Sequence, residues 1–497
     1  MTEREVNILC DRLIPRPQKI NFRDGAEYIL CDNCMVTVNV RHDGEQCAEL
    51  AGKLFASYWQ CVPEIRIGSL PEALSNGESY EVKISENVLE ISGNGTAAVF
   101  NAMKTLRQLA EVQRGTERVS GYFLVQCEIR DFPALAFRGI HLCIFPETPL
   151  WDIEKQLRIA AYHKFNYAVI EPWGVFPFES HPEFVWKDKQ LDKAELKRLI
   201  ILGKELGITL IPQFNLLGHA SASRSVTGKH AVLSYEPKLQ PLFEPEGWSW
   251  CLTNPETRKI QTDLVLELYE FFDCPEYFHI GCDEADNIAT CRDCRRKELK
   301  ALVKEHICYF HDLFAGRNAR VIMWHDMLIT KGDPRWKGYT ACGLPEHQLG
   351  ELYQELPRDI IIADWQYRDP DTLPEDADPE WPVAKFFQEA DFEVLVCPWL
   401  NWQGIAGQGK MAAGRKLAGM LETTWHIFHD RNAVAVYCCA AGAAWNPENI
   451  PQNTLSNRLA LAQHTRQIDW DAGVDEYIKT GWCQYQLTPG VHPRQEF

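Results

Sequence analysis

The sequence predicts an α/β protein in which a (β/α)8 TIM barrel follows a small α+β accessory domain. From Phe137 onward, short runs of β-branched and aromatic residues alternate with longer segments that have helical periodicity. Eight such strand–helix pairs can be counted, and eight consecutive pairs close most simply into a barrel of parallel strands with right-handed crossovers. The chain has 497 residues, 45% of them hydrophobic, which is enough for one large domain and one smaller one.

Each barrel strand is expected where a short apolar run ends in a turn signal. The expected strands are Arg138–Ile144, Tyr167–Glu171, Thr209–Phe214, Tyr277–Gly281, Arg320–Trp324, Ile360–Trp365, Val394–Pro398 and Gly419–Trp425. The clearest expected helices are Trp151–Lys164, Asp192–Leu206, Pro255–Phe272, Cys291–Phe314 and Gly404–Leu417, with a last one within Asn432–Ala444. Chemistry in such barrels takes place at the carboxyl ends of the strands, so the residues just beyond each run are the functional candidates.

The predicted domain organisation has three parts: an accessory domain at 1–133, the barrel at 134–450 and a helical or capping segment at 451–497. In the accessory domain the expected strands are Val36–Val40, Glu64–Ile67, Tyr80–Ser85 and Val88–Ser92, and the expected helices are Gln46–Gln60 and Thr96–Glu111. Catalytic residue types are not concentrated in this domain. We therefore expect it to support the barrel rather than to take part in chemistry.

The composition excludes some classes of partner. A formal net charge of −18, from 69 acidic and 51 basic residues, repels phosphate backbones and anionic lipid headgroups. We therefore expect neither nucleic acid nor a membrane as partner, and no apolar run has the length of a membrane span. The first residues lack the apolar core of a signal peptide, which predicts a cytoplasmic protein whose 18 cysteines are mostly reduced. The sequence leaves open whether the chain is a monomer or a homodimer.

Two adjacent acidic residues follow a buried-strand pattern in the segment His279-Ile280-Gly281-Cys282-Asp283-Glu284. The apolar run is typical of a strand, Gly281 marks its end, and both carboxylates then fall on the turn that follows. Repulsion and desolvation raise the pKa of at least one such neighbour, which can keep one acid protonated beside one ionised base near neutral pH. The pair therefore predicts acid–base chemistry.

Polar and aromatic residues gather at or just beyond the predicted strand ends. They are Pro146, Glu171, Trp173, Asn215, His219, Asp283, Glu284, Trp324, Asp326, Trp365, Trp399, Asn401, Trp402 and Trp425. Several tryptophans there would form flat apolar walls, on which the C–H faces of a sugar and an N-acetyl methyl group can stack. A single tryptophan is more simply a core or rim residue, but five at strand ends favour a sugar pocket.

The acidic segment resembles the His-x-Gly-Gly-Asp-Glu signature of family 20 glycoside hydrolases, the β-N-acetylhexosaminidases. The resemblance covers nearly the whole chain. Four segments resemble the family's accessory domain and entry strand: Leu13–Pro17, Gly95–Leu109, Ile129–Pro133 and Arg138-Gly139. Two more resemble its third strand and the turn that follows: Ile211–Phe214 and Gly218-His219-Ala220. Three other segments are more similar to a bacterial branch of the family than to its best-studied members: the Gly-Cys-Asp-Glu variant, Gly228-Lys229-His230 and Trp250–Pro255.

The resemblance implies an exo-acting, retaining hydrolase for a terminal N-acetylhexosamine, in which the substrate's own acetamido oxygen is the nucleophile. It implies that Glu284 is the general acid and later the base, while Asp283 orients the acetamido group. His219 would tune the pKa of Glu284, backed by Glu171; a structural histidine and a buried ion pair are the alternatives. The implied substrate-binding set is Arg138, Glu171, Trp324, Asp326, Trp365, Trp399, Asn401 and Trp425, of which Trp324, Trp365 and Trp425 enclose the acetamide. No cofactor is implied for the chemistry.

The chain departs from the family pattern at the sugar's far hydroxyls. The Arg that follows the family's first barrel strand is replaced in Leu142–Pro146, and its Tyr-x-Asp on strand seven reads Trp399-Leu400-Asn401. The acidic residue expected after the last-strand Trp is replaced near His426-Ile427. These changes predict a substrate other than plain terminal GlcNAc, such as GalNAc, a modified hexosamine, or a sugar held by rim residues drawn from Arg138, Arg224, Lys229 and His230.

A Cys-x2-Cys pair, Cys291 and Cys294, follows the acidic turn. With Cys282 and one further group it could hold a structural zinc ion, whereas the alternative is a pair of reduced thiols at a helix start. Two other functions stay open: a carbohydrate-binding protein without turnover, and a metal-dependent hydrolase that uses the cysteines with His279 or His219.

Overall fold

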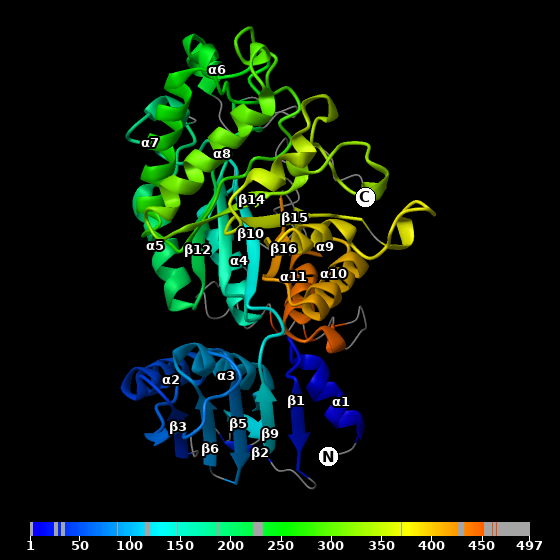
Figure 1. Ribbon diagram of the computed structural model, residues 1–497. Helices are drawn as coiled ribbons and strands as arrows, with labels where there is room; N and C mark the ends of the chain where they lie inside the picture. Colours follow the sequence, from blue (N-terminus) through cyan, green and yellow to red (C-terminus); the bar gives the residue numbers. More distant parts are fainter. Residues whose placement is uncertain are drawn as a thin grey trace. The chain divides into compact units, whose positions relative to one another are not determined.

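The computed structural model describes residues 3–23, 28–30, 35–86, 88–114, 120–146, 148–185, 188–221, 232–368, 370–425 and 432–451, with 460 and 464 (Figure 1). Its contacts divide the chain into two compact units. We call them the accessory unit (Met1–Ala136, Arg158–Lys164, Val434–Trp482) and the barrel unit (Phe137–Leu157, Phe165–Ala433, Cys483–Phe497). The domain boundaries at 133 and 450 stay a prediction, and nearly all of segment 451–497 lies outside the described residues.

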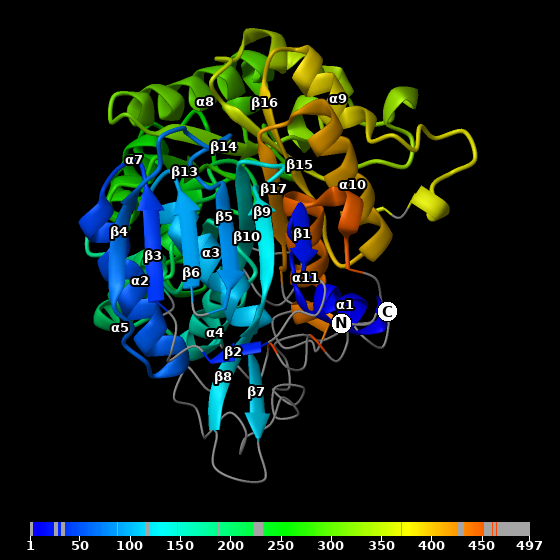
Figure 2. The same cartoon turned by 90° about the horizontal axis from the view of Figure 1, so that it is seen from below.

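The accessory unit is built on a six-stranded sheet with the order β1-β9-β5-β6-β3-β4. Its strands are β1 (Lys19–Phe22), β3 (Met35–Val40), β4 (Ile65–Ser69), β5 (Tyr80–Ser85), β6 (Val88–Gly93) and β9 (Cys127–Asp131). The alternating burial of β3 and β5 places one face of the sheet in the core. Helices α2 (Gly44–Trp59) and α3 (Thr96–Leu109) pack on the sheet, as Figures 1 and 2 both show (Figure 2).

Several accessory elements were not predicted from the sequence. They are α1 (Glu3–Arg12), β1, β9 and a small three-stranded sheet of β2 (Tyr28–Leu30), β8 (Ser120–Val125) and β7 (Glu111–Arg114). The two predicted helices and four predicted strands are all present, with ends shifted by at most three residues. The missed strands have three to six residues, and most of them hold too few alternations to establish a period of two.

A buried ion pair lies within the accessory unit. The Lys164 ammonium is 2.8 Å from Asp131 Oδ2 and donates to the Tyr80 hydroxyl at 2.9 Å, and both charged side chains are at most 1% exposed. Tyr80 donates to the same Asp131 oxygen at 2.6 Å, while the Trp445 indole donates to the other at 2.7 Å. Each carboxylate oxygen therefore has a donor, and the negative charge has a permanent cation beside it.

The barrel unit contains one eight-stranded parallel sheet, in the order β12-β11-β10-β17-β16-β15-β14-β13. An isolated parallel bridge between Gln213 and His279 joins its two edges, so the barrel is nearly closed. Its strands are β10 (Phe137–Ile144), β11 (Tyr167–Pro172), β12 (Thr209–Pro212), β13 (Tyr277–His279), β14 (Arg320–Trp324), β15 (Ile361–Trp365), β16 (Glu393–Cys397) and β17 (Gly419–Thr423). The predicted fold is thus confirmed, and every strand begins within one residue of its predicted start.

All but one of the helices that alternate with these strands were predicted individually, and the exception is Pro382–Glu389. The helices are α4 (Leu150–Tyr162), α5 (Lys193–Glu205), α7 (Pro255–Phe271), α8 (Leu299–Ala315), α9 (Pro382–Glu389), α10 (Trp402–Arg415) and α11 (Asn432–Trp445). The helix predicted to start at Cys291 begins only at Leu299, after a short 3-10 turn at Cys294–Arg296. Between β14 and β15 the described chain forms 3-10 turns, of which the longest is η8 (Leu349–Glu355).

Aromatic rings fill the amino-terminal end of the barrel. Phe137 stacks on Tyr167 with ring centroids 4.3 Å apart, and Tyr277 contacts both rings. Arg138 also lies at this end, as the second residue of β10, and is 2% exposed. Six residues at about 3.3 Å each separate it from the carboxyl end of β10, about 20 Å away. The prediction that Arg138 binds the substrate is therefore wrong, because it belongs to the opposite end of the barrel from the acidic turn.

None of the helices in the described ranges is both long enough and apolar enough to cross a membrane. A cytoplasmic location and the oligomeric state stay predictions.

Candidate active site

The two adjacent carboxylates are presented by a strained turn at the carboxyl end of β13. Gly281, Cys282 and Glu284 all have positive φ angles, of 64°, 74° and 46°. A positive φ favours glycine at position 281. A side chain there would also clash, because its Cβ would lie 2.1 Å from Asn215 Oδ1. The two non-glycine residues in the left-handed region store strain, a feature that clusters at functional sites.

His219 lies between the two carboxylates. Its Nε2 atom is 3.2 Å from Asp283 Oδ2 and 3.2 Å from Glu284 Oε2. Asp283 is buried and accepts a second hydrogen bond, from Asn215 Nδ2 at 2.9 Å. The Glu284 side chain is 44% exposed. The turn therefore offers one carboxylate fixed from two sides and one that solvent or a ligand can reach.

A third carboxylate, Asp326, supports this turn from behind. It is fully buried; its Oδ2 accepts from the backbone N–H of Glu284 at 2.9 Å, and its Oδ1 accepts from the Trp365 indole at 3.1 Å. Burial first, and then the charge of Asp283, raise the pKa of Asp326 to about 7. The sequence predicted a substrate contact here, but both carboxylate oxygens face protein donors. Asp326 therefore links the acidic turn to Trp365, and a substrate contact at Asp326 stays a prediction.

The loop between β12 and α7 contributes Trp248, which the sequence did not single out. Its indole donates to the Glu284 carbonyl at 2.6 Å, and its ring centroid is 4.2 Å from that of His219. The same loop approaches the acidic turn at Gly218, where a Cβ would lie 2.1 Å from the Asp283 carbonyl oxygen. Trp248 was missed because it stands in a long loop, and only residues just beyond the strands were taken as candidates.

Aromatic side chains from four strand ends lie together at the mouth of the barrel. Trp324 is fully buried among barrel-core residues, with its ring 4.4 Å from His279 and 5.9 Å from Trp425, so it belongs to the core beside the other aromatic rings. Tyr367, another residue that was not predicted, lies 5.3 Å from Trp365 and 5.2 Å from Trp399 between ring centroids. Its hydroxyl accepts from the Trp425 indole at 2.7 Å.

Two predicted substrate contacts have other partners in the structure. Glu171 is buried and lies 3.3 Å from His141 Nε2 and 3.4 Å from the Cys143 thiol, which is the arrangement of a buried ion pair. Asn401 is the N-cap of α10, and its Oδ1 accepts from the Gly404 N–H at 2.7 Å. The rim candidates Arg224, Lys229, His230, His426 and Ile427 lie outside the described residues.

The Cys-x2-Cys pair has a different partner from the predicted one. The thiols of Cys291 and Cys294 gather with Cys251 and the Glu244 carboxylate, and all four ligand atoms lie within 4.8 Å of one another. Cys282 is not in this group. It is fully buried, and its thiol donates to the Ile280 carbonyl at 3.4 Å. The prediction that Cys282 joins the pair is corrected, because the strained turn points its side chain into the barrel wall.

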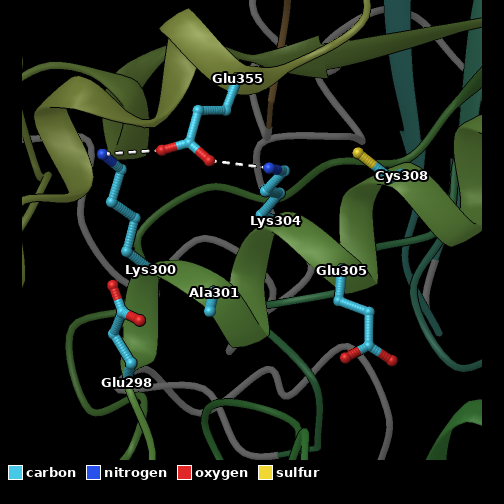
Figure 3. Close-up of a pocket in the computed structure, with 7 residues that line it drawn as sticks. All are labelled: Glu298, Lys300, Ala301, Lys304, Glu305, Cys308 and Glu355. Atoms are coloured by element: carbon cyan, nitrogen blue, oxygen red, sulfur yellow. Dashed lines mark hydrogen bonds and ion pairs between the residues drawn. The ribbon is translucent and has the colours of Figure 1, made fainter.

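A charged hollow on α8 is a weaker candidate for an active site than the mouth of the barrel. Figure 3 shows Glu355 between Lys300 and Lys304, with oxygen–nitrogen distances of 2.9 and 2.7 Å (Figure 3). Hydrogen bonds from the two lysines lower the pKa of Glu355 to about 2. These charges satisfy one another in solvent, unlike the three carboxylates at the acidic turn, and so they leave no group with an unusual protonation state.

Two family models match the chain. Residues 180–383 match the catalytic domain of glycosyl hydrolase family 20, and residues 11–132 match domain 2 of the same family. Among curated proteins, the chain is 25% identical over 230 residues to a chitooligosaccharidolytic beta-N-acetylglucosaminidase of Bombyx mori, covering 43% of this chain and 38% of that protein. It is 23% identical over 304 residues to a beta-N-acetylhexosaminidase of Cellulomonas fimi, covering 55% and 59%. The matches thus span well under two thirds of these relatives.

Solved structures share the fold over almost the whole chain. The Flavobacterium johnsoniae chitobiase superposes with a TM-score of 0.68 at 16% identity, covering 93% of this chain and 73% of the other. The Streptomyces plicatus N-acetyl-beta-hexosaminidase superposes with a TM-score of 0.65 at 15% identity, covering 94% and 96%.

Proposed function

The chain belongs to glycosyl hydrolase family 20, and on that premise we propose that it removes terminal β-linked N-acetylhexosamines by a retaining, substrate-assisted reaction. The observation that carries the proposal is the single His219 nitrogen placed 3.2 Å from both Asp283 and Glu284. One exposed acid and one buried, fixed carboxylate are what two separate duties require.

Glu284 moves the protons in the proposed reaction. It donates a proton to the glycosidic oxygen as the bond from that oxygen to C1 breaks, and the acetamido oxygen forms the new bond to C1. The positive charge on the resulting oxazolinium ring lies beside Asp283, which accepts a hydrogen bond from the acetamido N–H. Water then attacks C1, Glu284 takes its proton, and the ring reopens to give the sugar with its original anomeric configuration.

His219 and Asp326 are positioning residues in this scheme. A protonated His219 lies beside both carboxylates, so it stabilises the negative charge that Glu284 gains when its proton passes to the leaving group. Asp326 holds the Glu284 backbone N–H and the Trp365 indole. The reaction uses only side chains and the substrate's acetamido group. A zinc ion at the Cys291 and Cys294 pair would therefore have a structural role.

The pocket for the acetamide is proposed to lie between Trp365, Trp399 and Trp425, with Trp324 beside them. In the family, the hydroxyl of a tyrosine on strand seven contacts the acetamide oxygen, but Trp399 stands at that position here. We propose that the Tyr367 hydroxyl takes this role, because the Tyr367 ring lies between Trp365 and Trp399. The sugar's far hydroxyls lack the Arg that the family places after the first barrel strand, since Pro146 stands there. This favours GalNAc or a modified hexosamine over plain GlcNAc, although one relative, from Bombyx mori, is a beta-N-acetylglucosaminidase.

A panel of aryl β-glycosides tests the proposal. Aryl β-GlcNAc and β-GalNAc should be hydrolysed, whereas the matched glucoside and galactoside, which lack the acetamido group, should not. Equal turnover of substrates without this group would contradict the mechanism. Binding of the sugar with no turnover of any substrate would instead favour a carbohydrate-binding protein, and loss of turnover with a chelator, without loss of folded structure, would favour a metal-dependent hydrolase.

A further inference from the structure

Three thiols and one carboxylate converge at a place that the proposed chemistry does not use. Cys251 and Glu244 come from the loop between β12 and α7, while Cys291 and Cys294 follow the acidic turn. Glu244 is fully buried, and Cys251 and Cys294 are at most 5% exposed. The two segments are about forty residues apart in sequence, which is why only the Cys-x2-Cys half of the cluster could be recognised from the sequence alone.

The distances between the sulfur atoms are those of a tetrahedral site. Cys251 Sγ lies 3.8 Å from Cys291 Sγ and 3.7 Å from Cys294 Sγ. A zinc ion binds thiolates at about 2.3 Å, and the edge of a tetrahedron is about 1.6 times that length, or about 3.8 Å. A disulfide would need sulfurs about 2.05 Å apart. The cluster therefore has the spacing of ligands around one ion rather than that of a covalent pair.

Protein groups satisfy only part of the Glu244 carboxylate. Glu244 Oε2 accepts from the Cys291 N–H at 2.5 Å, but Oε1 is buried with no hydrogen-bond partner. Within the described residues no lysine, arginine or histidine forms an ion pair with Glu244. A buried carboxylate oxygen with no hydrogen-bond partner is costly unless a cation is bound there.

Hydrogen bonds also prepare the thiols for a metal. The Cys294 N–H donates to Cys291 Sγ at 3.3 Å, and the Thr253 hydroxyl lies 3.2 Å from Cys294 Sγ. The Thr253 hydroxyl also lies 3.5 Å from Cys251 Sγ, so it contacts two of the three thiols. Such outer contacts orient ligands in metal sites.

We infer that Glu244, Cys251, Cys291 and Cys294 bind one zinc ion in a closed, tetrahedral structural site. Three thiolates and one carboxylate form a soft ligand set that suits zinc and not magnesium or calcium. All four positions are filled by protein, which leaves none for substrate or water.

The site would fasten together the two segments that hold the general acid. The Glu244–Cys251 segment carries Trp248, which contacts both the Glu284 carbonyl and the His219 ring. The Cys291–Cys294 segment follows Glu284 by seven residues. A metal that joins these segments fixes the position of Glu284 from outside the pocket. This consequence rests on the proposed function; metal binding itself does not.

Metal analysis of the full chain, purified without added zinc, tests the site. We expect about one zinc per chain, and loss of it in a Cys291→Ser/Cys294→Ser variant. Cys274→Ser is the matched control, because Cys274 is an exposed cysteine outside the cluster. The control should keep its metal. Zinc below about a tenth of an equivalent in the wild-type chain, even after incubation with zinc and a reductant, would overturn the inference.

Two further measurements keep the test decisive if the double variant does not fold. Cobalt added to the metal-free wild-type chain should give thiolate-to-cobalt charge-transfer absorption, and Glu244→Gln should weaken zinc binding at least about tenfold. Absence of that absorption would contradict the site. Zinc binding without activity on any hexosaminide would support the metal site and count only against the proposed function. Activity in a chain that binds no metal would support the proposed function and count against the metal site.

Discussion

The two units of this chain treat buried carboxylates in opposite ways. In the accessory unit, Asp131 has a lysine ammonium 2.8 Å away and a donor on each oxygen. In the barrel unit, Asp283, Glu284 and Asp326 lie within one turn and its support, and His219, which is charged only when protonated, lies between the first two. The first arrangement has a permanent cation, whereas the second relies on a histidine, whose charge can change under physiological conditions.

The comparison teaches how to separate a structural charge cluster from a catalytic one. A permanent cation completes the accessory network and fixes its protonation state. The barrel carboxylates instead depend on one another and on a histidine, and burial raises the pKa of Asp326 to about 7. Removing a group from the first cluster should therefore affect stability, and removing one from the second should affect turnover.

Glu284→Gln should have the largest effect on activity. Loss of the general acid is expected to lower kcat about 10²- to 10⁴-fold, with little change in stability because the side chain is 44% exposed. The loss should shrink for aryl substrates with acidic leaving groups, which need no proton. Steady-state kinetics on a leaving-group series measures this. An equal loss for every leaving group would argue against Glu284 as the acid.

Lys164→Met should have the opposite effect to Glu284→Gln, because it should lower stability and leave activity unchanged. It leaves Asp131 as an uncompensated buried charge, so we expect a loss of about 3–5 kcal/mol in the free energy of unfolding. Activity per folded molecule should not change. Urea denaturation and active-site titration measure the two quantities. The double variant Lys164→Met/Asp131→Asn should recover part of the stability, and a double variant no more stable than the single one would contradict the ion-pair interpretation.

Asp326→Asn should change the pH dependence of stability. The folded pKa of about 7 lies above the usual value for an aspartate, so the folded state holds this proton more tightly than the unfolded state does. Its contribution to stability is fully present below pH of about 4 and is lost as pH rises through 7. Thermal midpoints across this range should fall more steeply for the wild-type chain than for Asp326→Asn. Parallel curves would show that Asp326 does not titrate in this window.

Asn401→Ala should have the smallest effect. Loss of the α10 N-cap is expected to cost about 1 kcal/mol of stability while leaving KM for the aryl hexosaminides unchanged. Asn401→Asp, which keeps a capping oxygen, is the matched control. A raised KM in the alanine variant, with KM restored by aspartate, would return Asn401 to the substrate-binding set.

Most of the barrel could be predicted from the sequence because its strands are buried apolar runs that end at turn signals. The acidic turn could be located for the same reason, since Gly281 ends such a run. Arg138 was misplaced because a residue at a strand start and one at a strand end look alike until the direction of the strand is considered. Asn401 was misread because a capping asparagine and a sugar-binding asparagine both follow a strand.

Most of the residues that the sequence analysis missed come from a chain segment far from the motif, whereas Tyr367 stands as close to a strand end as the predicted Asp326 and was overlooked. Trp248, Cys251 and Glu244 lie on the loop before α7, and Tyr367 stands two residues past the end of β15. Their roles depend on which segments the barrel brings side by side, and spacing along the chain carries no such information. The zinc ligands illustrate this: two were visible as Cys-x2-Cys, and the third was assigned to the nearest cysteine in sequence instead of the nearest in space.

The close approach of the β12 loop to the acidic turn has a further consequence. A Cβ at Gly218 or at Gly281 would fall 2.1 Å from an atom of the opposing segment. Even one methyl group at either position would push the two backbones apart and carry His219 away from Asp283 and Glu284. The distances from His219 to the two carboxylates therefore depend on the absence of a side chain at Gly218 and at Gly281. Replacing either glycine with alanine would lengthen these distances without changing any catalytic residue.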